Sequence, residues 1–532
     1  MTQTQLDQPL PKIWRVHHPI PDDISKSLHE FSPLLRQLLY NRGYQDPESA
    51  AAFLAGTVTF PTDPFLLSGM AQAVARLNRA IRDGERIVVY GDYDADGVTS
   101  TALLIGFLSS LGVEARPYIP DRYEEGYGLN EQAIRQLAEE GTDLVITVDC
   151  GVRAVKEVSL ANDLGIDVIV SDHHVPGADL PPAFAVIDPK QLGDPYPEKY
   201  LAGVGLAYKL VQAYLTQYPQ EGVCADDWLD LVAIGTVVDL APLKGENRML
   251  VRAGLEKIRR DPRQGIFSLA QVARIDLNKC NASNLGFGLG PRLNAAGRME
   301  SALTSFNLLT TSNPRSAGQL AQLLDSYNKE RQDITQEIRE TASDMVLSED
   351  PEAVLFFAAH PDFSEGVVGL AASRLVESYY RPSIVGHQGE TFTVASCRSI
   401  PEFHITRALD ECADLLVRHG GHAVAAGFTV RNENKDALVA RLRENAAAQL
   451  GEMELIPELK IDRKIKLDKL TGKHISTIME DLHKLEPTGR GNPEPVFASY
   501  DVAVRYARAV GRESSHLKLT LQAGANNFDA IA

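Results

Sequence analysis

Three short apolar runs in the first half of the chain each end in acidic residues, and this pattern restricts the possible folds more than any other feature. The runs and the first acid after each are 87–90 with Asp92, 144–148 with Asp149, and 168–170 with Asp172. Helical patterns at 101–111 and 155–164 follow the first two runs. Because strands that alternate with helices form βαβ units, we expect an α/β fold with a mostly parallel sheet.

The acids at these strand ends are candidate metal ligands. The carboxyl ends of parallel strands share one edge of a sheet, so the acids and the neighbouring His173 and His174 should meet there. Carboxylates and imidazoles without thiolates suit Mn²⁺ or Mg²⁺ better than structural zinc. Converging acids repel one another, and two divalent cations about 3.5–4 Å apart would neutralise them and support phosphoryl chemistry.

Each motif has a simpler interpretation when it is taken alone. Residues 92–97 could form a calcium loop or a solvated turn, although an EF-hand would need a glutamate where Leu103 stands. The pair of histidines could lie in a surface loop or in a satisfied core. Asp239, which follows an apolar stretch, could be an N-cap or a surface acid. The order of the motifs and their places at strand ends favour one shared metal site.

Other patterns predict the remaining parts of the chain. Residues 1–80 look helical, with runs at 24–39 and 70–82. An unbroken helical pattern at 315–347 would span roughly 50 Å at ~1.5 Å per residue. Its single narrow apolar seam suits a bridge between two domains, although an ordinary packed helix would look the same.

A second α/β segment and a small β-barrel are expected in the last third of the chain. The segment contains a strand at 353–358 and a helix at 367–377. After Pro457 the chain changes to short alternating runs separated by turns, which is typical of a barrel. The chain stops at Ala532 within one of these runs, so we expect the barrel to be incomplete or closed in another way.

Composition leaves the substrate open. A formal net charge of −18 argues against a nucleic-acid-binding protein, but bound cations would reverse the charge of an acidic centre, and a narrow basic groove is invisible in a total. No apolar run reaches the length of a membrane span, and the N-terminus has no apolar signal core. The five cysteines form no CxxC pair, so we expect a protein of the reducing cytoplasm.

Eight segments resemble the DHH phosphoesterase family and, within it, the RecJ-type exonucleases. Four resemble the family's metal motifs, namely GDYDADGVTST (91–101), VDCG (148–151), SDHH (171–174) and VVDLAPL (237–243). Four others are similar to RecJ-type sequences, namely DRYEEGYGLN (121–130), GPRLNAAGRM (290–299), HGGH (419–422) and LEPTGRGNPE (485–494). The resemblance therefore extends over nearly the whole chain.

This resemblance implies a two-metal exonuclease that degrades single-stranded DNA from 5′ to 3′ in DNA repair and recombination. The implied ligands of two Mn²⁺ or Mg²⁺ ions are Asp94, Asp96, Asp149, His173 and Asp239, with Asp149 as the bridge. Asp92 and Asp172 would orient these ligands, and His174 would contact the scissile phosphate. The resemblance implies single-stranded DNA, a RecQ-type helicase and single-stranded-DNA-binding protein as partners, and no interaction with a membrane.

The resemblance also implies residues that hold DNA. They are Arg122, Arg292, Asn294 and Arg298 in the first domain, Arg374, Ser396 and Arg398 in a pocket for the 5′ phosphate, and Gly420, Gly421 and His422 beside the nucleotide. Ordinary surface arginines or a simple turn could produce the same patterns. The implied domains are a helical extension (1–80), a DHH domain (81–310), a connecting helix (311–348), a DHH-associated domain (349–452) and an OB-fold (453–532).

Three related classes of protein remain as alternatives. Small DHH phosphodiesterases of short RNA or cyclic dinucleotides lack the N-terminal extension, the long helix and the OB-fold that the sequence predicts. Inorganic pyrophosphatases of this type carry a histidine where Tyr90 stands. Catalytically inactive replication scaffolds have lost metal ligands, whereas this sequence retains all of those named above.

Overall fold

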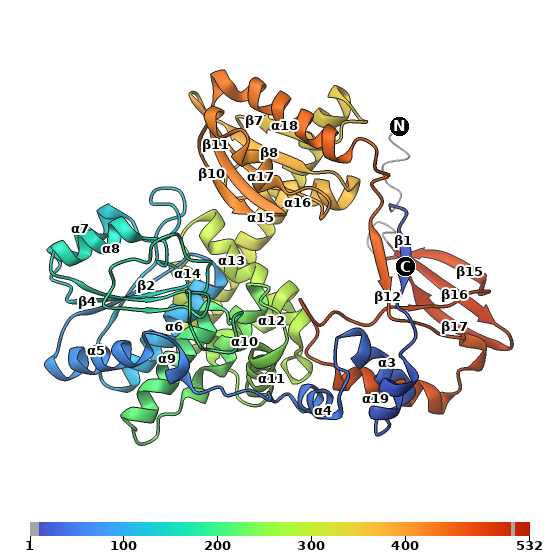
Figure 1. Cartoon of the computed structure of the whole chain (residues 1–532), viewed down its shortest axis with the longest axis horizontal. Coiled ribbons are helices and arrows are strands. Elements are labelled where there is room, and N and C mark those ends of the chain that lie inside the picture. The colour runs from blue at the N-terminus through green and yellow to red at the C-terminus, as the bar shows by residue number, and fades with distance from the viewer. Residues whose placement is uncertain (1–9, 512–515) are drawn as a thin grey trace.

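A five-stranded parallel sheet lies in the first half of the chain, where the sequence predicts strands (Figure 1). In the computed structural model, which describes residues 10–511 and 516–532, its strand order is β3–β2–β4–β5–β6. The strands are β2 (Ile87–Gly91), β3 (Arg116–Tyr118), β4 (Leu144–Val148), β5 (Asp167–Ser171) and β6 (Ala185–Ile187). All neighbouring pairs are parallel, which confirms the predicted α/β fold.

Both faces of this sheet are buried, and this explains why its strands are apolar without interruption. In β2, Ile87 and Val89 pack on one face, whereas Val88 and Tyr90 pack on the other. The first face is covered by α5 (Met70–Asp83), α6 (Ala95–Ser110) and α9 (Gly203–Gln217), and the second by α7 (Glu131–Glu139) and α8 (Val155–Asp163).

A helical layer follows the sheet in the chain and packs against α6 and α9. Its elements are η2 (Ala225–Trp228), α10 (Leu229–Val238), α11 (Gly245–Arg260), α12 (Gln264–Ala273), η3 (Leu277–Lys279), the π-helical turn η4 (Asn284–Leu289), α13 (Gly290–Met299) and α14 (Leu303–Thr310). Helix α10 is apolar on all sides because the layer surrounds it, and it ends beside the carboxyl edge of the sheet.

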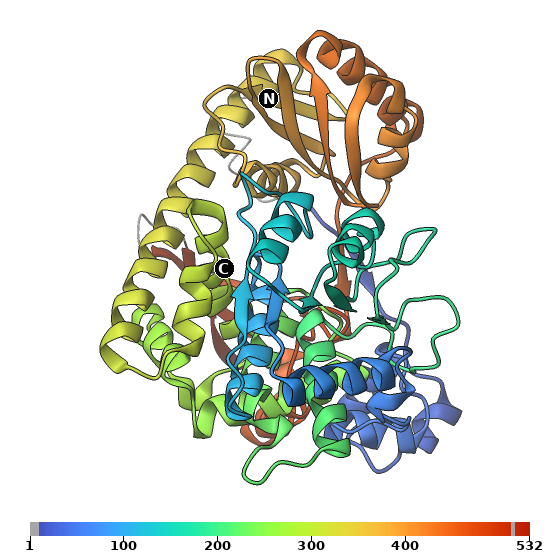
Figure 2. The same cartoon turned by 90° about the vertical axis from the view of Figure 1, so that its left-hand side faces the viewer.

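One long helix, α15 (Pro314–Glu349), connects this layer to the second half of the chain, as the sequence predicts. Asn313 caps its first turn by accepting hydrogen bonds from the N–H groups of Arg315 and Ser316. The first half of the helix packs on α12, α13 and α14, and the second half packs on α16 (Val368–Tyr379). Figure 2 shows this helix along one side of both α/β units.

The second unit contains a mixed five-stranded sheet of order β10–β11–β9–β8–β7. Its strands are β7 (Phe356–His360), β8 (Ser383–Gln388), β9 (Phe392–Arg398), β10 (Leu416–His422) and β11 (Ala425–Arg431). Only β7 and β8 are parallel to each other among these neighbours. One face is covered by α16 and the end of α15, and the other by α17 (Ile405–Asp410), η5 (Ala413–Leu415), η6 (Asn432–Asn434) and α18 (Lys435–Leu450).

The C-terminal part consists of short strands and one helix. The elements are β12 (Glu458–Ile461), β13 (Arg463–Lys464), η7 (Leu467–Lys469), α19 (Gly472–Lys484), β14 (Phe497–Ala498), β15 (Ala503–Val510), β16 (His516–Ala523) and β17 (Asn526–Ile531). Strands β15, β16 and β17 form an open antiparallel sheet, and β13 pairs with β14 separately. Across residues 10–511 and 516–532 these strands do not close into a barrel.

The N-terminal residues differ from the helical extension that the sequence predicts. Strand β1 (Ile13–Val16) pairs in parallel with β12 from the C-terminal part. Helices α2 (Asp22–Ser27), α3 (Pro33–Asn41) and α4 (Pro47–Ala55) pack against α19, and the helical turn η1 (Pro64–Leu66) leads to α5. Residues 13–55 are therefore built into the C-terminal part, whereas α5 packs on the parallel sheet. Residues 1–9 lie outside the described part.

None of the helices within the described ranges is both long enough and apolar enough to cross a membrane.

Candidate metal centre and anion pocket

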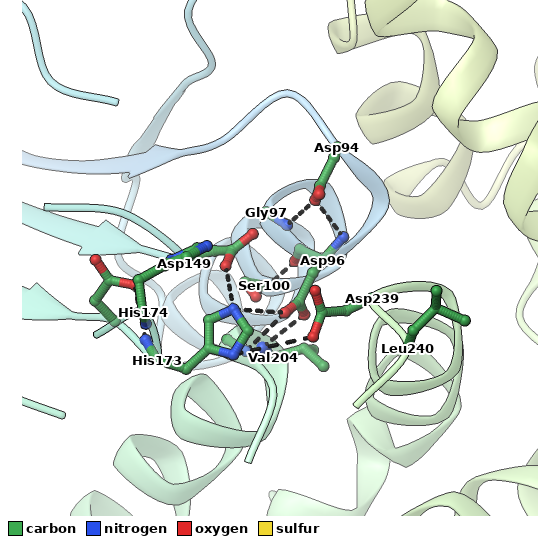
Figure 3. A network of polar contacts seen from close by, with 12 residues as sticks. Asp94, Asp96, Gly97, Ser100, Asp149, His173, His174, Val204, Asp239 and Leu240 are labelled. Carbon is green, nitrogen blue, oxygen red and sulfur yellow. Dashed lines mark hydrogen bonds and ion pairs between the residues drawn. The ribbon is translucent and has the colours of Figure 1, made fainter. Parts of the chain in front are cut away.

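The acids and histidines of the strand ends meet at the carboxyl edge of the parallel sheet, as expected. Figure 3 shows Asp96, Asp149, His173 and Asp239 pointing toward one another. Asp96 comes from the first turn of α6, Asp149 and His173 follow β4 and β5, and Asp239 ends α10. Three groups have ligand atoms within 4.8 Å of one another, namely Asp149–His173–His174, Asp96–His173–Asp239 and Asp92–Asp94–Asp149.

The spacing of these atoms fits a shared cation better than direct hydrogen bonds. His173 Nε2 lies 3.0 Å from Asp149 Oδ1 and 3.9 Å from Asp96 Oδ2, and His173 Nδ1 lies 3.9 Å from Asp239 Oδ2. Among the described residues, Asp149 Oδ1, His173 Nε2 and Asp92 Oδ1 are buried without any hydrogen-bond partner. Buried polar atoms normally have partners, and a metal ion that attracts both carboxylate and imidazole would satisfy these three.

The pKa values of the cluster show how strongly the acids repel one another. Burial, followed by the charge of Asp94, raises the pKa of Asp92 to about 8 and that of Asp96 to about 7. Burial and then Asp96 raise the pKa of Asp239 to about 8, and similar causes hold the pKa of Asp149 well above its ordinary value. Divalent cations would remove this repulsion and let the carboxylates ionise at neutral pH.

His173 is held neutral, as a metal ligand must be. Burial and the neighbouring His174 lower the pKa of His173 to about 3. Its backbone carbonyl accepts a hydrogen bond from Lys190, a half-buried residue that follows β6. This contact holds the backbone of the histidine in place.

Asp172 contacts His174 and the backbone of His173, whereas its role in orienting the metal ligands stays a prediction. Asp172 Oδ1 lies 2.8 Å from His174 Nδ1 and accepts hydrogen bonds from the N–H groups of His173 and His174. Burial lowers the pKa of His174, but the hydrogen bond and charge of Asp172 outweigh it and raise this pKa above its ordinary value. The Tyr127 hydroxyl lies 3.2 Å from the same Nδ1 and also donates to Asp149 O, so Tyr127 and Asp172 both contact this edge of the ring.

The loop that carries the first acids is fixed by its own backbone contacts. Asp94 caps α6 by accepting hydrogen bonds from the N–H groups of Asp96 and Gly97. Asn294 Oδ1 accepts a 2.7 Å hydrogen bond from Ala95 N. Asp149 has a φ of 63°, in the left-handed region that is unfavourable for a residue with a side chain. Such strain is typical of functional sites.

A group of arginines lies close to this acidic centre; we call Arg122, Arg298, Arg331 and Arg398 the arginine cluster. Burial lowers the pKa of Arg298 to about 10, and the like charges of Arg122, Arg331 and Arg398 contribute to this shift. Burial and Arg374 lower the pKa of Arg331, whose Nε is buried without a partner in the described ranges. Several cations with few neutralising acids indicate a site for an anion.

One edge of the arginine cluster lies at the start of α16. An ideal Cβ on Gly369 would stand 3.1 Å from Arg398 Nη2 and 3.3 Å from Ser396 Oγ, so the glycine lets both groups lie close to this helix end. Peptide N–H groups at a helix N-terminus favour an anion, and the serine hydroxyl and the guanidinium add to them. The structure therefore brings Ser396 and Arg398 together.

The segment 420–422 borders a cavity between the two α/β units. This cavity, of about 290 Å³, is lined by Tyr127, Arg153, His174, Gly421 and His422, among others. Gly421 has a φ of 145°, and a Cβ there would lie 2.4 Å from Ala425 O. Gly421 and His422 therefore share this cavity with Asp172 and His174, and their place beside a nucleotide stays a prediction.

Comparison with known proteins places the chain in a family. Three family models match it, described as "DHH family, N-terminal domain" (residues 86–236), "DHHA1 domain" (333–448) and "RecJ OB domain" (461–532). The single-stranded-DNA-specific exonuclease RecJ of Escherichia coli is 36% identical over 525 residues, which cover 94% of this chain and 89% of that protein. The chain belongs to the RecJ family.

Solved structures of RecJ proteins agree with this assignment. The crystal structure of RecJ in complex with Mn²⁺ from Thermus thermophilus has a TM-score of 0.83 and 31% identity, covering 97% of this chain and 74% of that one. The RecJ of Bacillus subtilis is 40% identical over 97% of this chain, but the chain spans only 65% of the length of that relative. The match to the RecJ OB model confirms the predicted OB domain, although its strands form an open sheet here.

Three residues that the RecJ resemblance assigned to DNA have other contacts in the structure. Arg292 pairs with Asp325 at 2.9 Å and donates to Gly288 O, so its fork joins α13 to α15 instead of facing an anion. The side-chain carbonyl of Asn294 accepts a hydrogen bond from Ala95 N. Arg374 is exposed and pairs with Glu377 one turn along α16. Sequence patterns cannot show such pairings. Asp325 and Ala95 lie far along the chain from their partners, and a sequence does not show whether Arg374 pairs with Glu377 or with an anion.

Other RecJ-fold residues near the site are missed by sequence reasoning. Tyr127 and Lys190 contact His174 and His173, and Arg331 lies beside Arg298 in the arginine cluster; none of the three belongs to the acidic motifs. Tyr127 stands inside one of the segments that resemble RecJ-type sequences, and Lys190 follows a strand end. Both positions therefore gave a weak indication of a place near the site. Arg331 looks like any charged residue on a long helix, and nothing in the sequence distinguishes it.

Proposed function

We propose that this chain is a metal-dependent exonuclease that hydrolyses single-stranded DNA from the 5′ end, in DNA repair and recombination. The observation that carries the proposal is a buried cluster of acids and a neutral imidazole, with unpartnered atoms, beside an arginine cluster. The names of the relatives, which are single-stranded-DNA-specific exonucleases, support it.

Asp94, Asp96, Asp149, His173 and Asp239 would hold two Mn²⁺ or Mg²⁺ ions, with Asp149 between them. When bound, such a pair activates the attacking water and stabilises the charge that develops on the phosphate. Asp92 lies within the same reach as Asp94 and Asp149, so it could act as a ligand as well as an orienting residue. The RecJ structure with Mn²⁺ supports this choice of metal.

His174 would donate to an oxygen of the scissile phosphate. Its Nδ1 faces Asp172 at 2.8 Å, which leaves Nε2 for the substrate, and its raised pKa favours the protonated, donating form. Asp172 and Tyr127 would keep the imidazole in one orientation while the phosphate enters. His422, on the opposite wall of the 290 Å³ cavity, would border the terminal nucleotide.

The arginine cluster would set the polarity of digestion. Ser396 and Arg398, at the start of α16, would bind a terminal 5′ phosphate, and Arg122, Arg298 and Arg331 would hold the backbone between this anchor and the metals. Because α15 packs on both α/β units, the distance from the anchored end to the metals is fixed. A fixed distance from a 5′ phosphate gives cleavage in the 5′-to-3′ direction.

Digestion of end-labelled DNA with and without Mn²⁺ tests this proposal. The enzyme should release short products from 5′-phosphorylated single strands, cut blunt duplex far more slowly, and stop in excess EDTA. Digestion from the 3′ end, or equal rates on single and double strands, would refute it.

We also infer the setting in which such an enzyme works. Matches to the DHH, DHHA1 and RecJ OB models support such an enzyme, in which the OB domain would add a track for single strands. A RecQ-type helicase could supply such strands, single-stranded-DNA-binding protein could present them, and the cytoplasm is where they occur in bacteria. Co-purification with either partner from a cell extract tests this setting.

A further inference from the structure

The acid that ends α10 is held by residues from a distant part of the chain. Asp239 is the C-cap residue that directly follows Val238 at the end of α10, and Leu240 comes next with a φ of 62°. Leu240 N donates to Val237 O and Ala241 N donates to Thr236 O, which is the hydrogen-bond pattern of a Schellman motif. Glycine usually occupies the left-handed position of this motif, because a side chain there is sterically unfavourable.

Arg490 contacts both ends of the loop that follows. Its Nη1 donates a 3.1 Å hydrogen bond to Leu240 O, and its own carbonyl accepts a 2.7 Å hydrogen bond from Leu243 N. The side-chain contact thus falls on the residue with the unfavourable backbone conformation, directly after Asp239. Arg490, from the C-terminal part, thereby joins the two ends of the loop that follows the candidate metal ligand Asp239.

Arg490 is presented on a tight turn that is itself rigid. Gly489 and Asn492 exchange backbone hydrogen bonds of 2.8 and 3.1 Å, so Arg490 and Gly491 form the tip of the turn. Gly491 has a φ of 78°, and a Cβ on it would stand 3.2 Å from a side-chain carbon of Pro242. The turn therefore packs directly on the loop.

Two buried groups anchor the base of this turn. The fully buried Arg248, on α11, donates to the carbonyls of Phe53, Lys484, Leu485 and Pro487. The buried Asn492 side chain donates to two of the same carbonyls, those of Leu485 and Pro487, and accepts from Arg42 Nε at 2.8 Å. Three parts of the chain therefore meet at the base of the turn, and its tip cannot move independently of α11.

Resting on the function proposed above, we infer that Arg490 is a positioning residue of the metal centre. It acts through Leu240: by holding the left-handed backbone of that residue, it fixes Asp239 in the orientation that a metal ion needs. Residues that orient a ligand in this way commonly change metal affinity by roughly 10–100-fold when they are removed. This role is distinct from a contact with DNA, which would leave the affinity for metal unchanged.

Mn²⁺ titration of the full chain without DNA, followed by electron paramagnetic resonance, tests this role directly. Arg490→Ala should bind one of the two Mn²⁺ ions roughly 10–100-fold more weakly than the unmodified chain. Arg508→Ala, which removes an exposed arginine from β15 of the same C-terminal part, should bind both ions normally. If the unmodified chain binds no Mn²⁺ at all, the proposed function is wrong irrespective of Arg490.

A second substitution separates positioning from charge. Leu240→Gly removes the side chain that makes the left-handed conformation unfavourable, so it should restore much of the Mn²⁺ affinity of Arg490→Ala. Arg490→Lys, which keeps the charge, offers a milder variant if Arg490→Ala does not fold. Its Mn²⁺ affinity should lie between those of the unmodified chain and Arg490→Ala. Unchanged Mn²⁺ affinity in Arg490→Ala, or a weakened affinity that Leu240→Gly does not improve, would overturn the inference.

Discussion

At the scale of single residues, Asp149 is the most constrained member of the candidate centre. It lies in a left-handed backbone conformation, is almost fully buried, and has one carboxylate oxygen without a partner in the described chain. We predict that Asp149→Asn lowers the rate of single-strand digestion by at least about 100-fold and abolishes tight binding of one or both Mn²⁺ ions. Asp362→Asn, at an acid with an 89% exposed side chain, serves as the control. A near-normal rate for Asp149→Asn would exclude it from the centre.

Arg398 gives a second prediction at this scale, because it tests the anchor. Arg398→Ala should slow the digestion of 5′-phosphorylated strands by roughly tenfold or more, since a charge-assisted hydrogen bond contributes about 1.5–3 kcal/mol. Strands with a 5′ hydroxyl should be affected much less. Arg441→Ala, on α18 of the same unit and paired with Asp414, is the matched control. Equal losses on both substrates with a lower melting temperature would indicate a structural role.

The candidate site could be predicted from sequence where acidic residues or histidines directly follow predicted strands. The acids of the first three motifs follow buried strands, so the geometry of a parallel sheet brings them together. Arg292 could not be judged in this way, because its ion pair with Asp325 depends on how α13 packs on α15. Arg331 could not be found at all, since a buried face of a charged helix has no signature in one sequence.

At the scale of elements, α15 would set the distance between the proposed 5′-phosphate anchor and the metal centre. One alanine inserted after the exposed Gln332 should rotate the second α/β unit by about 100° and shift it by ~1.5 Å. We predict that this variant loses the preference for a 5′ phosphate and most of its exonuclease rate while it still binds two Mn²⁺ ions. Gln332→Ala, without the insertion, should behave normally. An insertion variant that retains both rate and preference would show that the two units do not act across a fixed distance.

Arg248 tests how the C-terminal part is attached. Arg248→Met keeps an unbranched apolar stem but removes one donor from each of four backbone carbonyls, two of which (Leu485 and Pro487) keep only Asn492. We predict a loss of at least about 3 kcal/mol in the free energy of unfolding. Urea unfolding measures this loss, and limited proteolysis should release the C-terminal part early. Arg260→Met, at the 82% exposed end of the same helix, should change neither result.

The strands of the C-terminal part show the limit of sequence patterns at this scale. Alternating residues after Pro457 predicted short strands, and strands β12 to β17 lie in this part of the chain. The pairing of β12 with β1 was not predicted, because a parallel pair between Ile13–Val16 and residues far along the chain depends only on tertiary contacts. Residues 1–80 were therefore assigned to a helical extension that the structure divides between two parts of the molecule.

At the scale of the whole molecule, metal binding should govern stability. The raised pKa values of Asp92, Asp96 and Asp239, between about 7 and 8, mean that the metal-free folded chain binds protons more tightly than the unfolded chain. Its stability should therefore fall as pH rises from ~4 toward 8. Mn²⁺ replaces these protons, and at 100 times its Kd it should add about 2.7 kcal/mol. We predict a larger rise in melting temperature with Mn²⁺ at pH 8 than at pH 6; equal rises at both pH values would contradict this.

The pairing of β1 with β12 has a consequence for synthesis on the ribosome. Arg15 and its partner Glu458 are 443 residues apart, and β1 cannot complete its hydrogen bonds until β12 has emerged. At about 5–20 residues per second, that delay is roughly 20–90 s. During this time β1 and the apolar surfaces of α3 and α4 would lack their final neighbours while the parallel sheet could already fold. The newly made N-terminal segment should thus be the part of the nascent chain most exposed to chaperones and proteases.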